Sequence, residues 1–192
     1  MGVAGVVLAG GAGRRMGGLD KAALQVGGVT LLDRVLTAAR PVCDRLVVVG
    51  PTRPTTIPGV EFVMEDHRGG GPVPAVLAGL SACPECDTLL VLATDLPLLL
   101  PDHLRLLLSE LERRPDIEVV AALGPQGANP LLAAYRSAAL ASRATRLGLG
   151  PGAAASRLLP DAVRTVDLGP ATLNVNRPEE LAAAEGLVAD EG

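Results

Sequence analysis

The chain is almost without aromatic side chains. Its 192 residues include one Phe, one Tyr and no Trp, although 48% of the residues are hydrophobic. A core therefore has to be built from Leu, Val and Ala, and surfaces that stack nucleic-acid bases on aromatic rings are almost excluded. The formal net charge of -4 at pH 7 also lacks the basic excess with which proteins bind nucleic acid or anionic membranes. We expect a small-molecule ligand instead.

Long hydrophobic runs are missing as well. The longest, such as residues 89–93, fall far short of the roughly 18 to 20 apolar residues that a membrane-spanning helix requires. Residues 1–8 carry no positively charged stretch of the kind that begins a secretion signal, and they run directly into glycines. These two absences predict a cytoplasmic protein without a membrane span.

Cysteine is scarce, and its number is odd. The chain has Cys43, Cys83 and Cys86, of which the last two form a C-x-x-C pair. A structural zinc site usually needs four Cys or His ligands, and no second pair or His cluster completes one here. We therefore expect reduced thiols that hold no metal.

Short apolar runs recur along the chain and predict strands that are buried on both faces of a parallel sheet. An apolar stripe with helical spacing over residues 104–111 predicts a helix that begins near Pro101, and a second helix is expected from Pro178. Strands that alternate with helices indicate a doubly wound, mostly parallel α/β sheet with helices on both faces, formed by a single domain over residues 1–192. The expected strands cover residues 3–9, 45–49, 60–64, 88–93 and 118–123.

The first expected strand leads into a segment rich in glycine and cationic residues. Residues 8–21 read LAGGAGRRMGGLDK, which combines Gly10, Gly11 and Gly13 with Arg15 and Lys21. Glycine lets the backbone approach a ligand closely, and exposed N–H groups beside cationic side chains form a cradle for phosphates. The segment lacks the third glycine of the dinucleotide fingerprint and the Gly-Lys-Ser/Thr of a Walker A loop. It predicts a triphosphate site of another kind.

Asp95 follows the expected strand at 88–93 almost directly. Ligand sites of doubly wound sheets lie beyond the carboxyl ends of the strands, so this carboxylate is expected in the site. Magnesium typically takes one or two carboxylates and completes its shell with water and phosphate oxygens. We predict that Asp95 binds Mg2+, and the alternative is a cap for the helix near Pro101.

Asn174 and Asn176 form an alternating pair ahead of the last helix. In an extended segment, side chains two residues apart project to the same side, where both amides could complete the metal shell. Asn176 is also well placed to cap the helix that follows, and the sequence leaves both roles open.

Three separated strings resemble those of the molybdenum cofactor guanylyltransferases, within the wider nucleotidyltransferases of doubly wound fold. They span nearly the whole chain, and their order and spacing agree with that family. The strings are Leu-Ala-Gly-Gly with Gly-Gly-x-Asp20-Lys21, then Thr-Asp95-Leu-Pro, and finally Asn174-Val-Asn176 followed by Pro-Glu-Glu-Leu.

The resemblance implies a site and a reaction. Leu8, Ala9 and Gly10 would contact the guanine nucleotide through their main chain, Lys21 would neutralise its phosphates, Asp95 would hold Mg2+, and Asp66 would add a nucleotide contact. Arg15 and Lys21 would stabilise the leaving pyrophosphate. The implied reaction transfers GMP from GTP to molybdopterin, with molybdenum already loaded, and the implied partners of the product are molybdoenzyme apoproteins.

Departures from the family pattern leave the base and the acceptor open. Where the family often has an asparagine after the second strand, this chain reads Val-Gly-Pro-Thr over residues 49–52, and the usual Gly-Pro-Leu-Ala-Gly is interrupted by residues 73–76. A cytidylyltransferase for molybdopterin, a guanylyltransferase for another small phosphate such as phospholactate, and a GTP-binding cofactor carrier without turnover remain alternatives. His67 could approach the acceptor, but the sequence does not fix its geometry.

Overall fold

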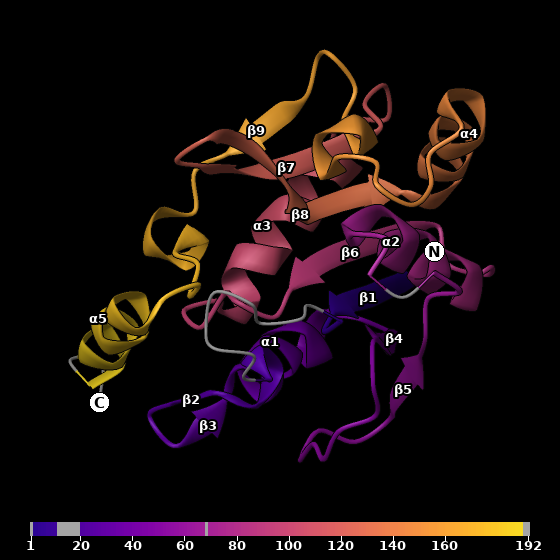
Figure 1. Cartoon of the computed structure of the whole chain (residues 1–192). Helices are drawn as coiled ribbons and strands as arrows, with labels where there is room; N and C mark the ends of the chain where they lie inside the picture. Colours follow the sequence, from indigo (N-terminus) through magenta and orange to yellow (C-terminus); the bar gives the residue numbers. More distant parts are fainter. Residues whose placement is uncertain (1, 11–19, 68, 190–192) are drawn as a thin grey trace.

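A twisted seven-stranded sheet forms the centre of the computed structural model, which describes residues 2–10, 20–67 and 69–189 (Figure 1). The strand order is β5-β4-β1-β6-β8-β7-β9, and β8 alone runs against its neighbours. The mostly parallel α/β sheet expected from the sequence is therefore confirmed. The strands are β1 (Val3–Leu8), β4 (Arg45–Val49), β5 (Val60–Val63), β6 (Thr88–Ala93), β7 (Val119–Gly124), β8 (Gly127–Arg136) and β9 (Arg164–Val166).

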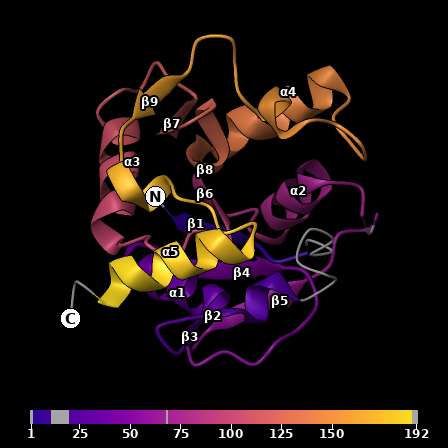
Figure 2. The ribbon, with the colours of Figure 1, turned by 60° about the vertical axis from the view of Figure 1, so that its left-hand side comes forward.

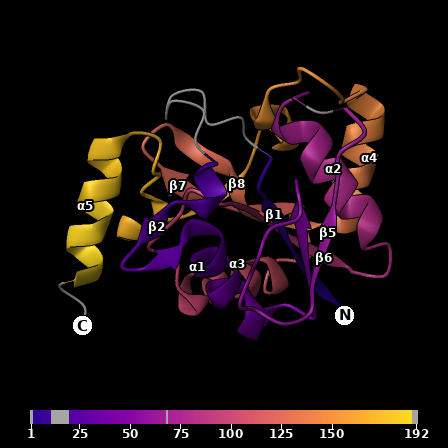
Figure 3. The same cartoon turned by 60° about the horizontal axis from the view of Figure 1, so that its bottom comes forward.

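Helices cover both faces of this sheet. Figure 3 shows α1 beside α3 and α2 beside α4, and each pair packs on a separate hydrophobic cluster. Alternate residues of β1 divide between the clusters, because Val7 contributes to the first and Val6 to the second. Burial on both faces explains the unbroken apolar runs of the strands. The helices are α1 (Leu31–Ala39), α2 (Pro72–Ala82), α3 (Pro101–Glu112), α4 (Ser137–Leu147) and α5 (Pro178–Ala189).

The C-terminal helix α5 lies to one side of the sheet (Figures 1 and 3), next to the β2–β3 hairpin (Figure 2). A third, smaller cluster joins them: Val175 and Ala184 from the C-terminal segment pack against Val26 and Leu31. The hairpin consists of β2 (Gln25–Val26) and β3 (Val29–Thr30), and it leads directly into α1. The last residues of the chain are thereby brought back to the segment that follows the glycine-rich loop. Short 3-10 helices connect these elements: η2 (Lys21–Ala23), η3 (Arg40–Val42), η4 (Ala155–Leu158) and η5 (Gly169–Thr172).

The sequence analysis missed β8, the antiparallel strand between β6 and β7. Its first half contains Asn129 and Pro130, which are turn residues in most contexts. The ladder between β7 and β8 shifts register between Ala121 and Ala122, which pair with Ala133 and Asn129. A bulge of this kind accommodates proline inside a strand, and the Tyr135 hydroxyl donates to the Pro130 carbonyl at 2.9 Å.

All three cysteines are buried free thiols. Burial raises the pKa of Cys43 to about 12 and that of Cys83 to about 11. Thiols with such pKa values stay protonated near neutral pH and are poor metal ligands and nucleophiles. Within residues 2–10, 20–67 and 69–189, no group of three or more His, Cys, Asp and Glu side chains could hold a metal ion. The cysteines are free, as the sequence predicted.

None of the helices in the described ranges is long and apolar enough to cross a membrane.

Gly79 lets α2 approach β1 closely. A Cβ built at this position would lie 2.3 Å from Cγ1 of Val6, far inside van der Waals contact. Since Val6 is completely buried in the strand below, neither element can move without disturbing the core. Helix–sheet packing thus explains why the interrupted Gly-Pro-Leu-Ala-Gly segment ends in a glycine, Gly79.

We expect Gly79→Ala to lower the free energy of unfolding by about 1 to 3 kcal/mol, because it overpacks the core. Gly186→Ala is the matched control, since Gly186 also lies in a helix and nothing lies within 4 Å of its added Cβ. That change should raise stability by about 0.5 to 1 kcal/mol. Urea denaturation followed by circular dichroism measures both, and an unchanged midpoint for Gly79→Ala would contradict the close approach.

Candidate functional site

The carboxyl ends of β1, β4 and β6 meet at one edge of the sheet. Leu8 at the end of β1 lies opposite Val49 of β4 on one side and Ala93 of β6 on the other. The Thr94 hydroxyl donates to the Leu8 carbonyl at 3.3 Å, which fixes the first residue after β6 to the end of β1. The exposed Gly10 and the half-buried Asp95 are therefore brought to the same edge.

Lys21 lies at the centre of this edge. Its ammonium Nζ donates to Oδ2 of Asp95 at 2.6 Å and to Oδ1 of Asn176 at 2.7 Å. Lys21 and Asp95 each expose 18% of their side chain, so the pair is sheltered but still open to a ligand. The segments that carry Lys21, Asp95 and Asn176 are far apart in the sequence, and they meet at the lysine ammonium.

A backbone contact brings Asn176 to this position. The N–H of Val175 donates to the Asp95 carbonyl at 2.9 Å, and the Val175 side chain is completely buried. Residues on either side of a buried neighbour in an extended segment face away from it. Asn176 reaches Lys21, whereas Asn174 is exposed and makes no hydrogen bond to the described site residues.

Of the two roles that the sequence left open for Asn176, capping of α5 is taken by another residue. Oε2 of Glu180 accepts the N–H groups of Asn176 at 2.5 Å and Arg177 at 3.0 Å, so Glu180 caps the start of α5. The side-chain oxygen of Asn176 instead accepts the hydrogen bond from Lys21. The alternative role of Asp95 as a helix cap is not seen either, since His103 Nδ1 accepts the Leu100 N–H at the start of α3.

The donor set suits a hard divalent cation. Asp95 offers a carboxylate and Asn176 an amide oxygen within reach of the same point, and Mg2+ prefers oxygen ligands of this kind. With a single carboxylate, an ion would need water and substrate phosphate oxygens for the rest of its shell. The residues therefore fit a magnesium ion that arrives with its nucleotide.

The glycine-rich loop itself lies largely outside the described residues, and so do the predicted sites Gly11, Gly13 and Arg15. Their roles stay predictions. Of the three predicted main-chain contacts, the Ala9 N–H is occupied by the Val49 carbonyl at 2.9 Å and the Leu8 carbonyl by Thr94. Gly10 is the exposed member.

Gly50 lies in the stretch after β4 that lacks the asparagine often found in the family, and its backbone accepts no side chain. Its φ is +147°, and a Cβ would lie 2.8 Å from the carbonyl carbon of Ala9. The N–H of Gly50 donates to the Val63 carbonyl at 2.8 Å, which ties the ends of β4 and β5 together.

Glu65, which was not predicted from the sequence, lies next to Gly10 at this edge of the sheet. It is only 8% exposed, both carboxylate oxygens lie 3.4 Å from a Cβ built on Gly10, and no described residue donates to Oε2. Glu65 is the second residue after β5, as Asp95 is the second residue after β6. A carboxylate directly after a strand, the pattern that predicted Asp95, could therefore have predicted Glu65 as well. The sequence analysis chose Asp66, which is exposed, as is His67.

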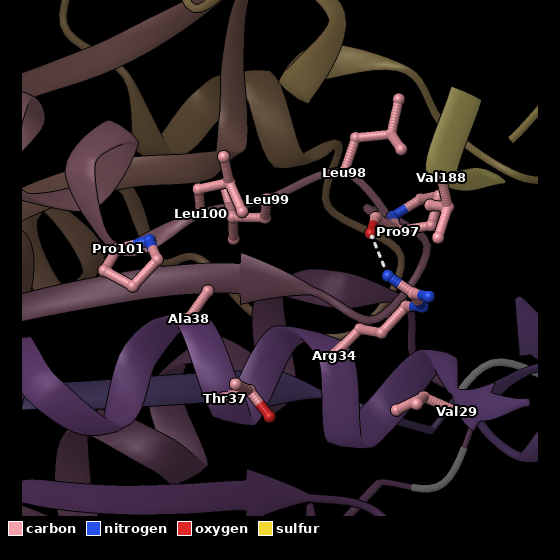
Figure 4. Close-up of a pocket in the computed structure, with 10 residues that line it drawn as sticks. All are labelled: Val29, Arg34, Thr37, Ala38, Pro97, Leu98, Leu99, Leu100, Pro101 and Val188. Carbon is pink, nitrogen blue, oxygen red and sulfur yellow. Dashed lines mark hydrogen bonds between the residues drawn. The ribbon is translucent and has the colours of Figure 1, made fainter. Parts of the chain in front are cut away.

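A separate pocket of about 220 Å³ lies between α1, residues 97–101 and α5 (Figure 4). Its walls are mainly apolar, and Arg34 crosses it to donate to the Pro97 carbonyl at 3.5 Å. It contains none of Lys21, Asp95 and Asn176. The segment that follows Asp95 forms one wall of this pocket, and the pocket is distinct from the site around Lys21.

Fold and site together define a doubly wound α/β protein with a lysine, a carboxylate and an amide gathered beyond the carboxyl ends of its strands, where proteins of this class bind their ligands. Comparison with known proteins identifies the group. The family profile described as the MobA-like NTP transferase domain matches residues 5–184. The chain belongs to this nucleotidyltransferase family.

The chain is similar to curated relatives over most of its length. It is 38% identical to a probable molybdenum cofactor guanylyltransferase of Mycobacterium avium over 167 residues, which cover 84% of this chain and 82% of the relative. It is 34% identical to the molybdenum cofactor guanylyltransferase of Cereibacter sphaeroides, with 96% of each chain covered.

The fold is also that of a solved structure, the molybdopterin-guanine dinucleotide biosynthesis protein A of Archaeoglobus fulgidus. The TM-score is 0.71 at 23% identity, with 97% of this chain and 99% of that chain covered. The doubly wound fold that the resemblance implied is thereby confirmed.

We expect Asn176→Ala to lower kcat/KM for nucleotide transfer about tenfold or more, since a hydrogen bond to a charged group contributes roughly 1.5 to 3 kcal/mol. Asn174→Ala is the matched control, because Asn174 is exposed and does not contact Lys21. Steady-state kinetics on both variants checks this. Equal losses in the two variants would contradict the assignment of Asn176 to the site.

Proposed function

We propose that this protein transfers GMP from GTP to molybdopterin already loaded with molybdenum, releases pyrophosphate and forms the guanine dinucleotide cofactor. The observation that carries the proposal is the convergence of Lys21, Asp95 and Asn176 at the edge of the sheet where β1 and β6 end. The curated relatives, which are named molybdenum cofactor guanylyltransferases, support guanine as the base. The proposed location is the cytoplasm.

The proposed chemistry is an in-line displacement at the α-phosphorus of GTP. An oxygen of the acceptor phosphate forms the new bond to this phosphorus, the bond to the bridging oxygen breaks, and the electron pair leaves with pyrophosphate. An ionised phosphate needs no strong general base. The protein therefore contributes mainly orientation of the substrates and stabilisation of charge.

Lys21 has the central role in this mechanism. Its ammonium is held between two oxygens before any ligand arrives, so little reorganisation is needed when phosphate oxygens approach. Asn176 and Asp95 both accept a hydrogen bond from Lys21 and so keep its side chain aimed at the site. Arg15, outside the described residues, is proposed to meet the same phosphates.

Mg2+ is the proposed cofactor, and Asp95 is its proposed ligand, with Asn176 as a weaker candidate. A bound Mg2+ supplies charge neutralisation on the phosphate oxygens. Asp95 also pairs with Lys21 through Oδ2, so the same carboxylate would link the cation of the protein with that of the metal.

The alternatives differ in base, in acceptor or in turnover. A cytidylyltransferase for molybdopterin would use CTP, and a guanylyltransferase for phospholactate would use a different acceptor. A GTP-binding carrier that hands cofactor to apoenzymes would have no need of a paired strand-end carboxylate and lysine. The relatives and the site together favour the guanylyltransferase.

Pyrophosphate release tests the proposal. The purified protein is incubated with Mg2+ and molybdenum-loaded molybdopterin, and GTP, CTP, ATP and UTP are compared side by side. We expect release with GTP, and its loss when EDTA removes the metal. A preference for CTP would make the protein a cytidylyltransferase, and no release with any nucleotide would favour another acceptor or the carrier.

Lys21→Ala and Asp95→Asn are each expected to reduce turnover on the order of a hundred- to a thousand-fold, the usual cost of one stabilising contact to the transition state. Both should fold normally, as judged by circular dichroism, because the pair lies at the surface of the site. Asp102→Asn, an exposed carboxylate on α3, should leave turnover unchanged. Near wild-type rates in Lys21→Ala or Asp95→Asn would overturn the roles given to them.

A further inference from the structure

Arg53 lies in the segment between β4 and β5 and forms a two-pronged ion pair with Asp20. Its Nε donates to Oδ2 of Asp20 at 2.6 Å, and its Nη2 donates to Oδ1 at 2.9 Å. The third nitrogen, Nη1, donates to the Pro51 carbonyl at 2.9 Å. Arg53 exposes only 13% of its side chain, the lowest value for any cation in an ion pair of the described residues. Such bidentate pairs fix geometry as well as charge.

The segment that carries Arg53 is itself fixed to α1. The carboxylate of Asp33, which is 7% exposed, accepts hydrogen bonds from the Thr55 hydroxyl at 2.5 Å, the Thr56 hydroxyl at 2.9 Å and the Thr56 N–H at 3.1 Å. A buried carboxylate with three donors is a firm anchor. The backbone segment from which Arg53 contacts Asp20 is therefore anchored to α1.

Asp20 stands directly before Lys21 and determines how η2 begins. Its Oδ1 accepts the Ala22 N–H at 3.2 Å, so the carboxylate caps the short helix whose first residue is Lys21. The same carboxylate is held by Arg53, which lowers its pKa through their hydrogen bonds. A short 3-10 helix has little stability of its own, so its position depends on such contacts.

We propose that Arg53 is a positioning residue that clamps Asp20 and thereby fixes the backbone from which Lys21 reaches the phosphates. The proposal rests on the proposed function only in the choice of GTP as the nucleotide whose binding is measured. It treats Arg53 as acting through Lys21 and not as a direct phosphate ligand. Followed from contact to contact, the support runs from Asp33 to Thr55 and Thr56, then to Arg53, to Asp20 and so to Lys21.

Two single variants distinguish a clamp from a direct phosphate contact. If Arg53 clamps Asp20, Arg53→Ala and Asp20→Asn should both weaken binding of the Mg2+ complex of GTP about 10- to 100-fold, measured by isothermal titration calorimetry. If Arg53 instead binds phosphate directly, Asp20→Asn should strengthen binding, because it removes a negative charge from the site. That result would overturn the proposal.

Two further comparisons show whether the effect passes through Lys21. The double variant Arg53→Ala/Asp20→Asn should bind no worse than either single variant, and Arg53→Ala should have little further effect in a Lys21→Ala background. Full additivity in both would overturn the clamp. Arg53→Lys keeps the charge without the two-pronged geometry, and it should recover binding only in part.

The matched control is Arg45→Ala, since Arg45 also pairs with carboxylates, Glu61 and Glu85, but at the opposite end of β4. It should leave nucleotide affinity unchanged, and thermal unfolding of each variant confirms that it is folded. If the wild type binds CTP in place of GTP, the proposed base is wrong and the clamp is tested with CTP. If all variants then bind like the wild type, the clamp is wrong and the proposed function stands.

Discussion

The contact of the Lys21 ammonium with Asp95 and Asn176 is the interaction on which the rest of the site depends. It joins the segment after the glycine-rich loop, the end of β6 and the approach to α5. A cation held by two oxygens in a sheltered place costs little to reorganise when phosphate arrives. The segment before α5, which carries Asn176, is held at the site by two contacts. One is the packing of α5 beside the hairpin, and the other is the hydrogen bond from the Val175 N–H to the Asp95 carbonyl.

Much of the fold followed from short-range patterns. The strands near residues 3, 45, 60, 88 and 119 were predicted because burial on both faces leaves unbroken apolar runs, and α3 and α5 because of their spacing and their prolines. The strand β8 was missed, since its Asn129 and Pro130 indicate a turn and only the bulge against β7 accommodates them.

The site was predictable where a residue follows a strand and much less so where tertiary contacts decide. Asp95 and Lys21 could be placed at the same edge from the sheet alone, but their direct contact could not. For Asn176, the competition between capping and the site is settled by Glu180, whose carboxylate takes the helix N–H groups. Glu65 and Asp66 are adjacent in sequence, and only burial tells them apart.

The contact at Lys21 and the departure from the family pattern lie in different parts of this edge. Lys21, Asp95 and Asn176 come from η2, the end of β6 and the approach to α5, and none of them belongs to β4 or β5. The departure from the family pattern falls at the end of β4, in residues 49–52, where close contact of Gly50 with Ala9 excludes any side chain at that glycine. This stretch includes none of the three residues that meet at the lysine. Similarity of fold alone therefore does not fix which nucleotide is used.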